Sequence, residues 1–131
     1  DKIKFDENYH IIGDFDLVLR LSAVSKIDCV QSPVAIYRRY NKNLSYLNRD
    51  RHIKELKNWI EKNQKKEIFK KKNLDPIREM IKYLEIVNRL KSKKKTAAFK
   101  QILGLPLGSK KILFFIALLL PNFFLKKIVN F

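Results

Sequence analysis

The sequence has one cysteine, few acidic residues for its size and no long apolar run. Cys29 cannot form a disulfide within the chain and has no His or Cys neighbours at zinc-site spacing, so we expect a reducing compartment. The apolar run at 112–120 is too short to cross a bilayer, which needs about 20 helical residues. The first residues lack the apolar core of a signal peptide and begin with Asp1 rather than Met, so we interpret the chain as a piece of a longer protein.

The composition is that of a modest globular domain with an uneven distribution of charge. The chain has 131 residues, 46% of them hydrophobic, and 29 basic against 13 acidic side chains give a net charge of +16. Residues 1–45 carry 7 basic and 6 acidic side chains, residues 46–111 carry 20 and 7, and residues 112–131 carry two lysines alone. These shifts predict three regions: a near-neutral head, a basic helical extension and an apolar tail.

The pattern of apolar residues predicts a mostly helical α+β fold. Two short β-branched runs on either side of Pro33, residues 26–30 and 34–38, predict strands, and Cys29 is expected to be a small buried side chain within the first. The remaining periodic segments predict helices, the first preceded by Asp14 at the N-cap position and expected to be largely buried. The predicted helices cover residues 15–24, a segment that Ser45 can cap and that runs through Arg51 to about residue 63 or 72, and residues 76–90 and 97–103.

Several motifs in the head occur in a recognisable order. The first are Phe5-Asp6-Glu7, Gly13-Asp14-Phe15-Asp16-Leu17 and Leu19-Arg20-Leu21, followed by Pro33-Val34-Ala35-Ile36-Tyr37-Arg38 and Asn43-Leu44-Ser45. In this order they resemble the closing part of the catalytic domain of family-2 glycosyltransferases, which have a GT-A fold and invert the anomeric centre. The resemblance covers roughly residues 5–45 and implies the end of a GT-A α/β domain, a short helix plus two strands, followed by C-terminal helices.

The resemblance implies that Asp14 is the general base that takes a proton from the acceptor hydroxyl. A positioned base contributes about 10² to 10⁴ in rate. From the residue alone, an Asp at this place is better explained as a helix N-cap, and it is the resemblance that favours the general base. Asp16 lies about 200° around the helix from Asp14, so we expect it to support the site together with Arg20, four residues on. The alternative is that Asp16 and Arg20 form a purely structural ion pair.

Further candidates follow the second predicted strand. The planar guanidinium of Arg38 suits the oxygens of a diphosphate. Tyr40 stands where the family often has a histidine, and this departure affects the contact with a metal or with the leaving diphosphate that the histidine would make. His10 and His52 have no partners at metal-ligand spacing and are expected to be ordinary surface or loop histidines. Trp59 fits the apolar face of its helix better than a sugar-stacking platform.

The resemblance also implies partners that this chain does not bind by itself. In the family, an N-terminal half binds the nucleotide-sugar donor and Mg²⁺ or Mn²⁺ through an acidic D-x-D-type motif, and nothing in these residues resembles that motif. The whole enzyme is therefore expected to need a divalent metal and to transfer a sugar to a glycan or lipid-linked acceptor in surface-polysaccharide synthesis. The 131 residues alone are expected to be inactive.

The basic extension and apolar tail favour an anionic membrane surface as a partner. Lysine clusters without interleaved aromatics or a nucleic-acid-binding motif argue against base readout, so no nucleic acid is expected. Phe114, Phe115, Phe123, Phe124 and Phe131 are candidate membrane-inserting residues, which predicts a peripheral protein on the cytoplasmic face of the cell membrane. Two alternatives remain: the tail packs as an ordinary core helix, or the chain is a non-catalytic basic adaptor that binds anionic membrane or nucleic acid.

Overall fold

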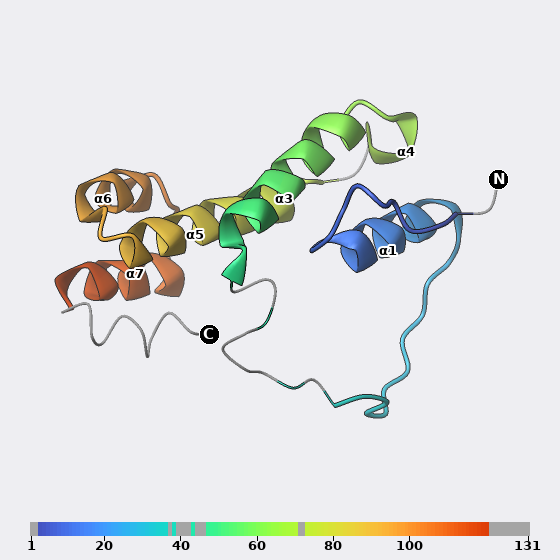
Figure 1. Cartoon of the computed structure of the whole chain (residues 1–131), viewed down its shortest axis with the longest axis horizontal. Helices are drawn as coiled ribbons and strands as arrows, with labels where there is room; N and C mark the ends of the chain where they lie inside the picture. Colours follow the sequence, from blue (N-terminus) through green and yellow to red (C-terminus); the bar gives the residue numbers. More distant parts are fainter. Residues whose placement is uncertain (1–2, 37, 39–42, 44–46, 71–72, 121–131) are drawn as a thin grey trace. The chain divides into compact units, whose positions relative to one another are not determined.

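The computed structural model describes residues 3–36, 38, 43, 47–70 and 73–120, and these residues form six helices and no strand (Figure 1). The prediction of an α+β fold is therefore wrong for the described part of the chain, which is all-helical. The chain divides into two compact units, Asp1–Asp75 and Pro76–Phe131. The boundaries at 45 and 111 were drawn from composition and do not coincide with this division, because the helices of region 46–111 belong to both units.

The two predicted strands are absent for a physical reason. Residues 26–36 and Arg38 are exposed and outside regular structure, and Tyr37 lies outside the described residues. Cys29, expected to be buried, is exposed. A β-branched run fits a pleated, half-buried surface, and it forms a strand only where a neighbouring strand pairs with its backbone. No such neighbour exists among the residues that the structure describes.

The first unit is built around Trp59. Its helices are α1 (Gly13–Val24), α3 (Arg49–Asn63) and the single turn α4 (Glu67–Lys70), so the predicted end near residue 63 is correct for α3. Trp59 of α3 is fully buried between Phe15 of α1 and Phe69 of α4, with ring centroids 5.7 and 5.2 Å away in edge-to-face geometry. The prediction that Trp59 is a core residue is confirmed.

Helix α1 is less buried than its sequence suggests. Its bounds agree with the predicted helix, but Asp16 is its only fully buried residue, and Val18 and Val24 are exposed. Apolar residues on most sides of a helix show what the helix is able to bury, whereas only the neighbouring elements decide what it does bury. In the first unit α1 presents one side to Trp59, and the expectation of a largely buried helix is wrong.

The second unit contains three helices that share one core. These are α5 (Asp75–Lys91), which begins at the last residue of the first unit, α6 (Lys95–Leu103) and α7 (Ser109–Leu119), and the predicted helices at 76–90 and 97–103 are confirmed. The breakers Gly104, Pro106 and Gly108 separate α6 from α7. The core is apolar and comprises Ile86, Leu90, Ala98, Ile102, Leu105, Phe114 and Ala117.

Helix α7 therefore belongs partly to a protein core. Phe114 and Ala117 are buried in the second unit, as the alternative of an ordinary core helix requires, while the opposite side of the helix is exposed. Phe123, Phe124 and Phe131 lie outside the described residues. Within the described ranges, no helix combines the length and the apolar character needed to cross a bilayer.

Candidate functional site

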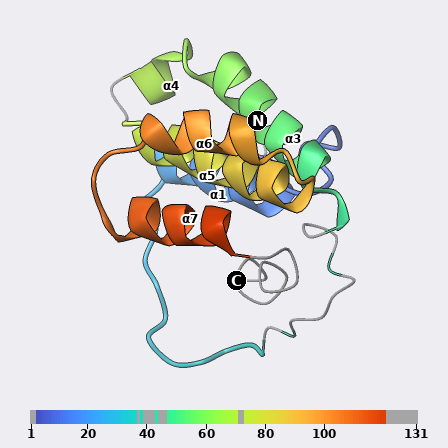
Figure 2. The same ribbon diagram turned by 90° about the vertical axis from the view of Figure 1, so that its left-hand side faces the viewer.

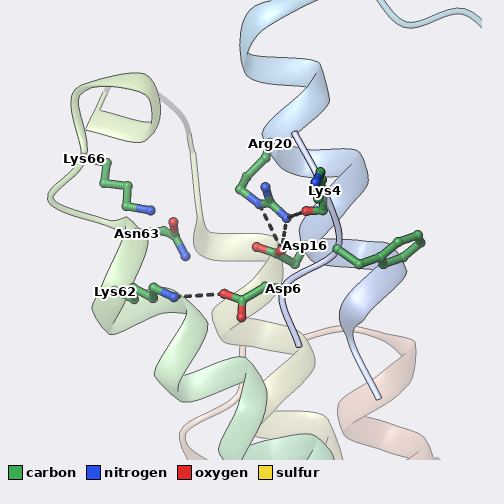
Figure 3. Close-up of a pocket in the computed structure, with 8 residues that line it drawn as sticks. Lys4, Asp6, Asp16, Arg20, Lys62, Asn63 and Lys66 are labelled. Carbon is green, nitrogen blue, oxygen red and sulfur yellow. Dashed lines mark hydrogen bonds and ion pairs between the residues drawn. The ribbon is translucent and has the colours of Figure 1, made fainter. Parts of the chain in front are cut away.

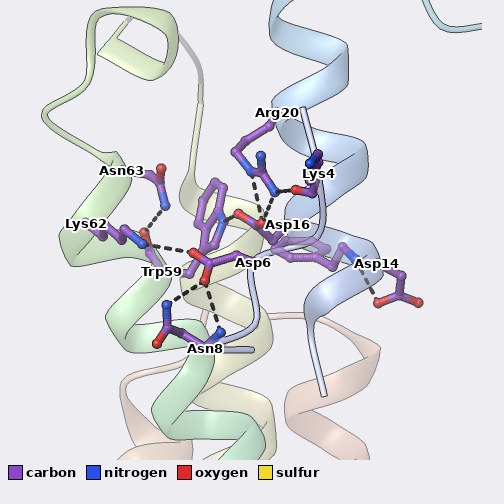
Figure 4. Close-up of polar contacts among 10 residues, drawn as sticks. Lys4, Asp6, Asn8, Asp14, Asp16, Arg20, Trp59, Lys62 and Asn63 are labelled. Carbon is purple, nitrogen blue, oxygen red and sulfur yellow. Dashed lines mark hydrogen bonds and ion pairs between the residues drawn. The ribbon is translucent and has the colours of Figure 1, made fainter. Parts of the chain in front are cut away.

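Asp14 lies in the first turn of α1 with its side chain in solvent. The N-cap of the helix is Ile12, and no side chain caps it, so the expectation that Asp14 is the N-cap residue is wrong. The Asp14 carboxylate accepts a hydrogen bond of 2.7 Å from the backbone N–H of Phe15. Figure 4 shows Asp14 directed away from the polar cluster around Asp16. Its carboxylate is thus accessible and is held at the positive end of the helix dipole.

The side chain of Asp16, unlike that of Asp14, is buried. It is 2% exposed, and its Oδ2 accepts hydrogen bonds from Arg20 Nη2 at 2.6 Å and Nε at 2.9 Å. The indole Nε1–H of Trp59 donates to Asp16 Oδ1 at 2.9 Å (Figure 4). Both oxygens of this carboxylate therefore hold other parts of the first unit in place. Asp14 and Asp16 point in different directions, as an offset of about 200° requires.

Arg20 joins α1 to the N-terminal segment. Besides binding Asp16, its Nη2 donates to the backbone carbonyl of Lys4 at 2.6 Å. The hydrogen bond to the Asp16 carboxylate raises the pKa of the Arg20 guanidinium above its ordinary value. The pair is intrahelical and mostly buried, so removal of either charge leaves the other poorly solvated.

Glu55 is a structural residue next to the site that the sequence did not single out. Its buried carboxylate accepts hydrogen bonds from the backbone N–H groups of His10, Ile11 and Ile12 at 2.9 to 3.3 Å, and Arg51 Nε donates to Oε1 at 3.0 Å. Glu55 thus fixes the three residues that lead directly into α1. The signal in the sequence was a charged residue placed between the apolar Ile53 and Leu56, which are also buried in α3. A charged side chain that is buried needs partners, so such a position indicates a structural contact.

Hydrogen bonding determines the charge state of Glu55. Burial raises the pKa of its carboxyl, but the backbone N–H groups and Arg51 outweigh burial, and the net pKa lies below 4.5. A carboxyl whose folded-state pKa is lowered adds stability above the unfolded-state pKa, and this stability is lost as the pH falls through the folded-state value.

We expect Glu55→Gln to lower the free energy of unfolding at neutral pH by about 1.5 to 3 kcal/mol, the range for hydrogen bonds to a charged group. The same variant should lose stability less steeply than the wild type as the pH falls below 4.5. Denaturant titrations at neutral and acidic pH measure both effects. Glu61→Gln, an exposed change on the same helix, is the control. An unchanged acid dependence in Glu55→Gln contradicts the assignment.

A polar pocket of about 320 Å³ opens beside Asp16 (Figure 3). At its edge Lys62 Nζ donates to Asp6 Oδ2 at 2.9 Å, and this hydrogen bond, with those from Asn8, lowers the pKa of Asp6 to about 2. Asn63 is 1% exposed, and its Oδ1 has no hydrogen-bond partner. The pocket is lined by Lys4, Phe5, Asp6, Asp16, Arg20, Lys62, Asn63 and Lys66, and Asp14 is not among them.

The remaining sequence-predicted residues that the structure describes do not line this pocket. Arg38 is exposed and outside any helix, and Tyr40 lies outside the described residues. His10 is exposed, whereas His52 is half-buried in α3, where burial lowers the pKa of its imidazole. No group of three His, Cys, Asp or Glu side chains suited to a metal occurs in the described ranges.

The chain matches no protein-family model, and comparisons with curated proteins and with solved structures give no match either.

Proposed function

We propose that this chain is the C-terminal part of an inverting glycosyltransferase that transfers a sugar from a nucleotide-sugar to a glycan or lipid-linked acceptor. The motif order of residues 5–45 suggests the reaction, and the geometry of α1 supports it. The observation that carries the proposal is that two carboxylates only two residues apart differ in exposure. Asp14 is exposed at the start of α1, whereas Asp16 is buried and bonded to Arg20 and Trp59.

In the proposed reaction Asp14 acts as the general base. Its carboxylate accepts the proton of the acceptor hydroxyl while that oxygen forms a bond to the anomeric carbon of the donor sugar. The bond from that carbon to the diphosphate breaks, the nucleoside diphosphate leaves with the electron pair, and the configuration inverts. Asp16 and Arg20 are positioning residues, because they fix α1 and the segment before it and leave Asp14 free to meet the acceptor.

The donor is bound by a nucleotide-binding half that belongs to the full-length polypeptide. Arg38 and Tyr40 are proposed to contact the diphosphate of the donor. The divalent metal is assigned to that other half, because the resemblance places the acidic D-x-D-type motif there. The enzyme is proposed to act on surface polysaccharide at the cytoplasmic face of the cell membrane.

The proposal is tested with the full-length polypeptide that contains these residues. Incubation with a panel of nucleotide-sugars and an acceptor should release nucleoside diphosphate and yield a product of inverted anomeric configuration, which NMR coupling constants report. The 131-residue chain alone should release none. A product of retained configuration, or no transfer with any donor in the panel, counts against the proposal.

A further inference from the structure

Helices α6 and α7 form a pair in which each helix caps the other. Lys95, the first residue of α6, donates from Nζ to the carbonyls of Leu118 and Leu120 at 2.8 and 3.0 Å, at the C-terminal end of α7. Lys111, in the first turn of α7, donates to the carbonyls of Leu103 and Leu105 at 2.9 and 2.8 Å, at the end of α6. Cations at C-terminal carbonyls are favourable on both hydrogen-bonding and dipole grounds. The two helices are therefore fixed side by side (Figure 2).

Beside this pair lies an open apolar groove of about 670 Å³, and two of its lining residues, Phe115 and Leu118, also pack against the core of the second unit. Phe99 and Phe115 contact each other in it, with ring centroids 6.1 Å apart in edge-to-face geometry. The groove is lined by Lys95, Thr96, Phe99, Lys100, Leu103, Phe115, Leu118 and Leu119. Its walls are thus apolar, and lysines stand at its border.

The apolar surface continues beyond the groove. Ile112 is 61% exposed and Leu119 is 86% exposed on α7, and Leu107, between the two helices, is 94% exposed. Leu113 and Ile116 are also exposed on α7. Single exposed apolar residues are common, whereas several on one helix beside an apolar groove indicate an interaction surface.

The charge around this patch has one sign. From Ile86 to the C-terminus the sequence contains no Asp or Glu, while Arg89 and nine lysines lie in the same stretch. Lys95 and Lys100 border the groove. A partner that covers the patch must therefore be apolar where it meets α6 and α7 and anionic around them. An anionic phospholipid bilayer has both properties, with acyl chains beneath a layer of phosphates.

We propose that the α6–α7 surface docks on an anionic phospholipid bilayer and lies flat at its interface. Ile112, Ile116 and Leu119 of α7 and Leu107 enter the boundary between headgroups and acyl chains, and Lys100 at the border of the groove contacts lipid phosphates. At 1.5 Å per residue, the 11 residues of α7 extend about 16 Å, well short of a hydrocarbon core of about 30 Å. Of the candidates from the sequence, Phe114 is buried in the core, whereas Phe115 is half-buried and lines the groove.

Vesicle sedimentation of the full chain tests this proposal. We expect binding to vesicles that contain phosphatidylglycerol, weaker binding as salt is raised, and little binding to pure phosphatidylcholine. The triple variant Leu107→Gln, Ile112→Gln, Leu119→Gln should bind at least about tenfold more weakly, because burial of each such side chain contributes more than this factor. The control variant Val34→Gln, Ile36→Gln changes two apolar residues that are 80% and 92% exposed in the first unit, and it should bind as the wild type does.

Circular dichroism verifies that both variants keep the helical content of the wild type, which is expected because the altered side chains are exposed. If the wild type does not bind vesicles, the proposal is wrong. The surface is then occupied by something else, such as residues 121–131, a second copy of the chain or RNA. If both variants lose binding equally, the α6–α7 surface is not where the bilayer docks. The test involves no sugar transfer, so its failure leaves the proposed transferase untouched, and loss of transfer would not affect the vesicle result.

Discussion

Replacement of Asp14 by Asn in the full-length transferase proposed here is expected to lower kcat by about 10² to 10⁴, the contribution of a positioned general base. Asn has the shape of Asp and can still accept the 2.7 Å hydrogen bond from the N–H of Phe15, but it cannot take a proton from the acceptor. The side chain is exposed, so the fold and donor binding should be unaffected. Initial rates of nucleoside diphosphate release measure kcat, and donor titration measures binding.

Asp28→Asn is the matched control for this experiment. Asp28 is also exposed, and it accepts a comparable hydrogen bond of 2.8 Å from the N–H of the next residue, Cys29. The two substitutions therefore remove the same charge from exposed carboxylates with a comparable hydrogen bond, and only the first should affect turnover. Full activity in Asp14→Asn removes Asp14 from the mechanism.

Asp16→Ala is expected to lower the free energy of unfolding of the first unit by about 3 to 5 kcal/mol, the cost of breaking a buried ion pair. The substitution leaves Arg20 without its carboxylate and leaves the indole N–H of the buried Trp59 without an acceptor. Small domains are stable by only about 5 to 15 kcal/mol, so a large part of the total is lost. Trp59 is the single tryptophan of the sequence, and its fluorescence in a denaturant titration reports the transition.

Two further variants separate charge from geometry. Asp16→Asn keeps an acceptor for Trp59 but loses the charge beside Arg20, so it should cost less than Asp16→Ala. Glu67→Ala removes an exposed ion pair between Glu67 and Lys70, in which the two side chains are 80% and 66% exposed. It should change the free energy of unfolding by less than about 1 kcal/mol. If Asp16→Ala proves as mild as Glu67→Ala, Asp16 does not hold α1 in place.

The periodicity of apolar residues predicted most of the helices well. The bounds of α1, α3, α5 and α6 agree with it to within a few residues, because their apolar faces and breakers such as Gly104 are local features. The strands at 26–30 and 34–38 failed because a strand depends on a partner elsewhere in the chain. The prediction that α1 is largely buried failed for a related reason, since the burial of a helix depends on what packs against it.

The candidate site was only partly predictable. The motif and the helical offset pointed to Asp14, Asp16 and Arg20, and the Asp16–Arg20 pair follows from a spacing of four residues. Glu55 and the pocket-lining Asn63 were missed. Glu55 binds backbone groups 43 to 45 residues away, and no periodic pattern relates positions so far apart.

The sequence by itself determined the helices, the strongly basic stretch free of acidic residues after Glu85, and the order of motifs that suggests sugar transfer. Only the tertiary structure decided which carboxylate is exposed, that Trp59 binds Asp16, and that Lys95 and Lys111 cap opposite helices. Helix formation depends on residues three or four positions apart. A buried hydrogen bond depends on which surfaces meet, and that is fixed only when apolar faces pack.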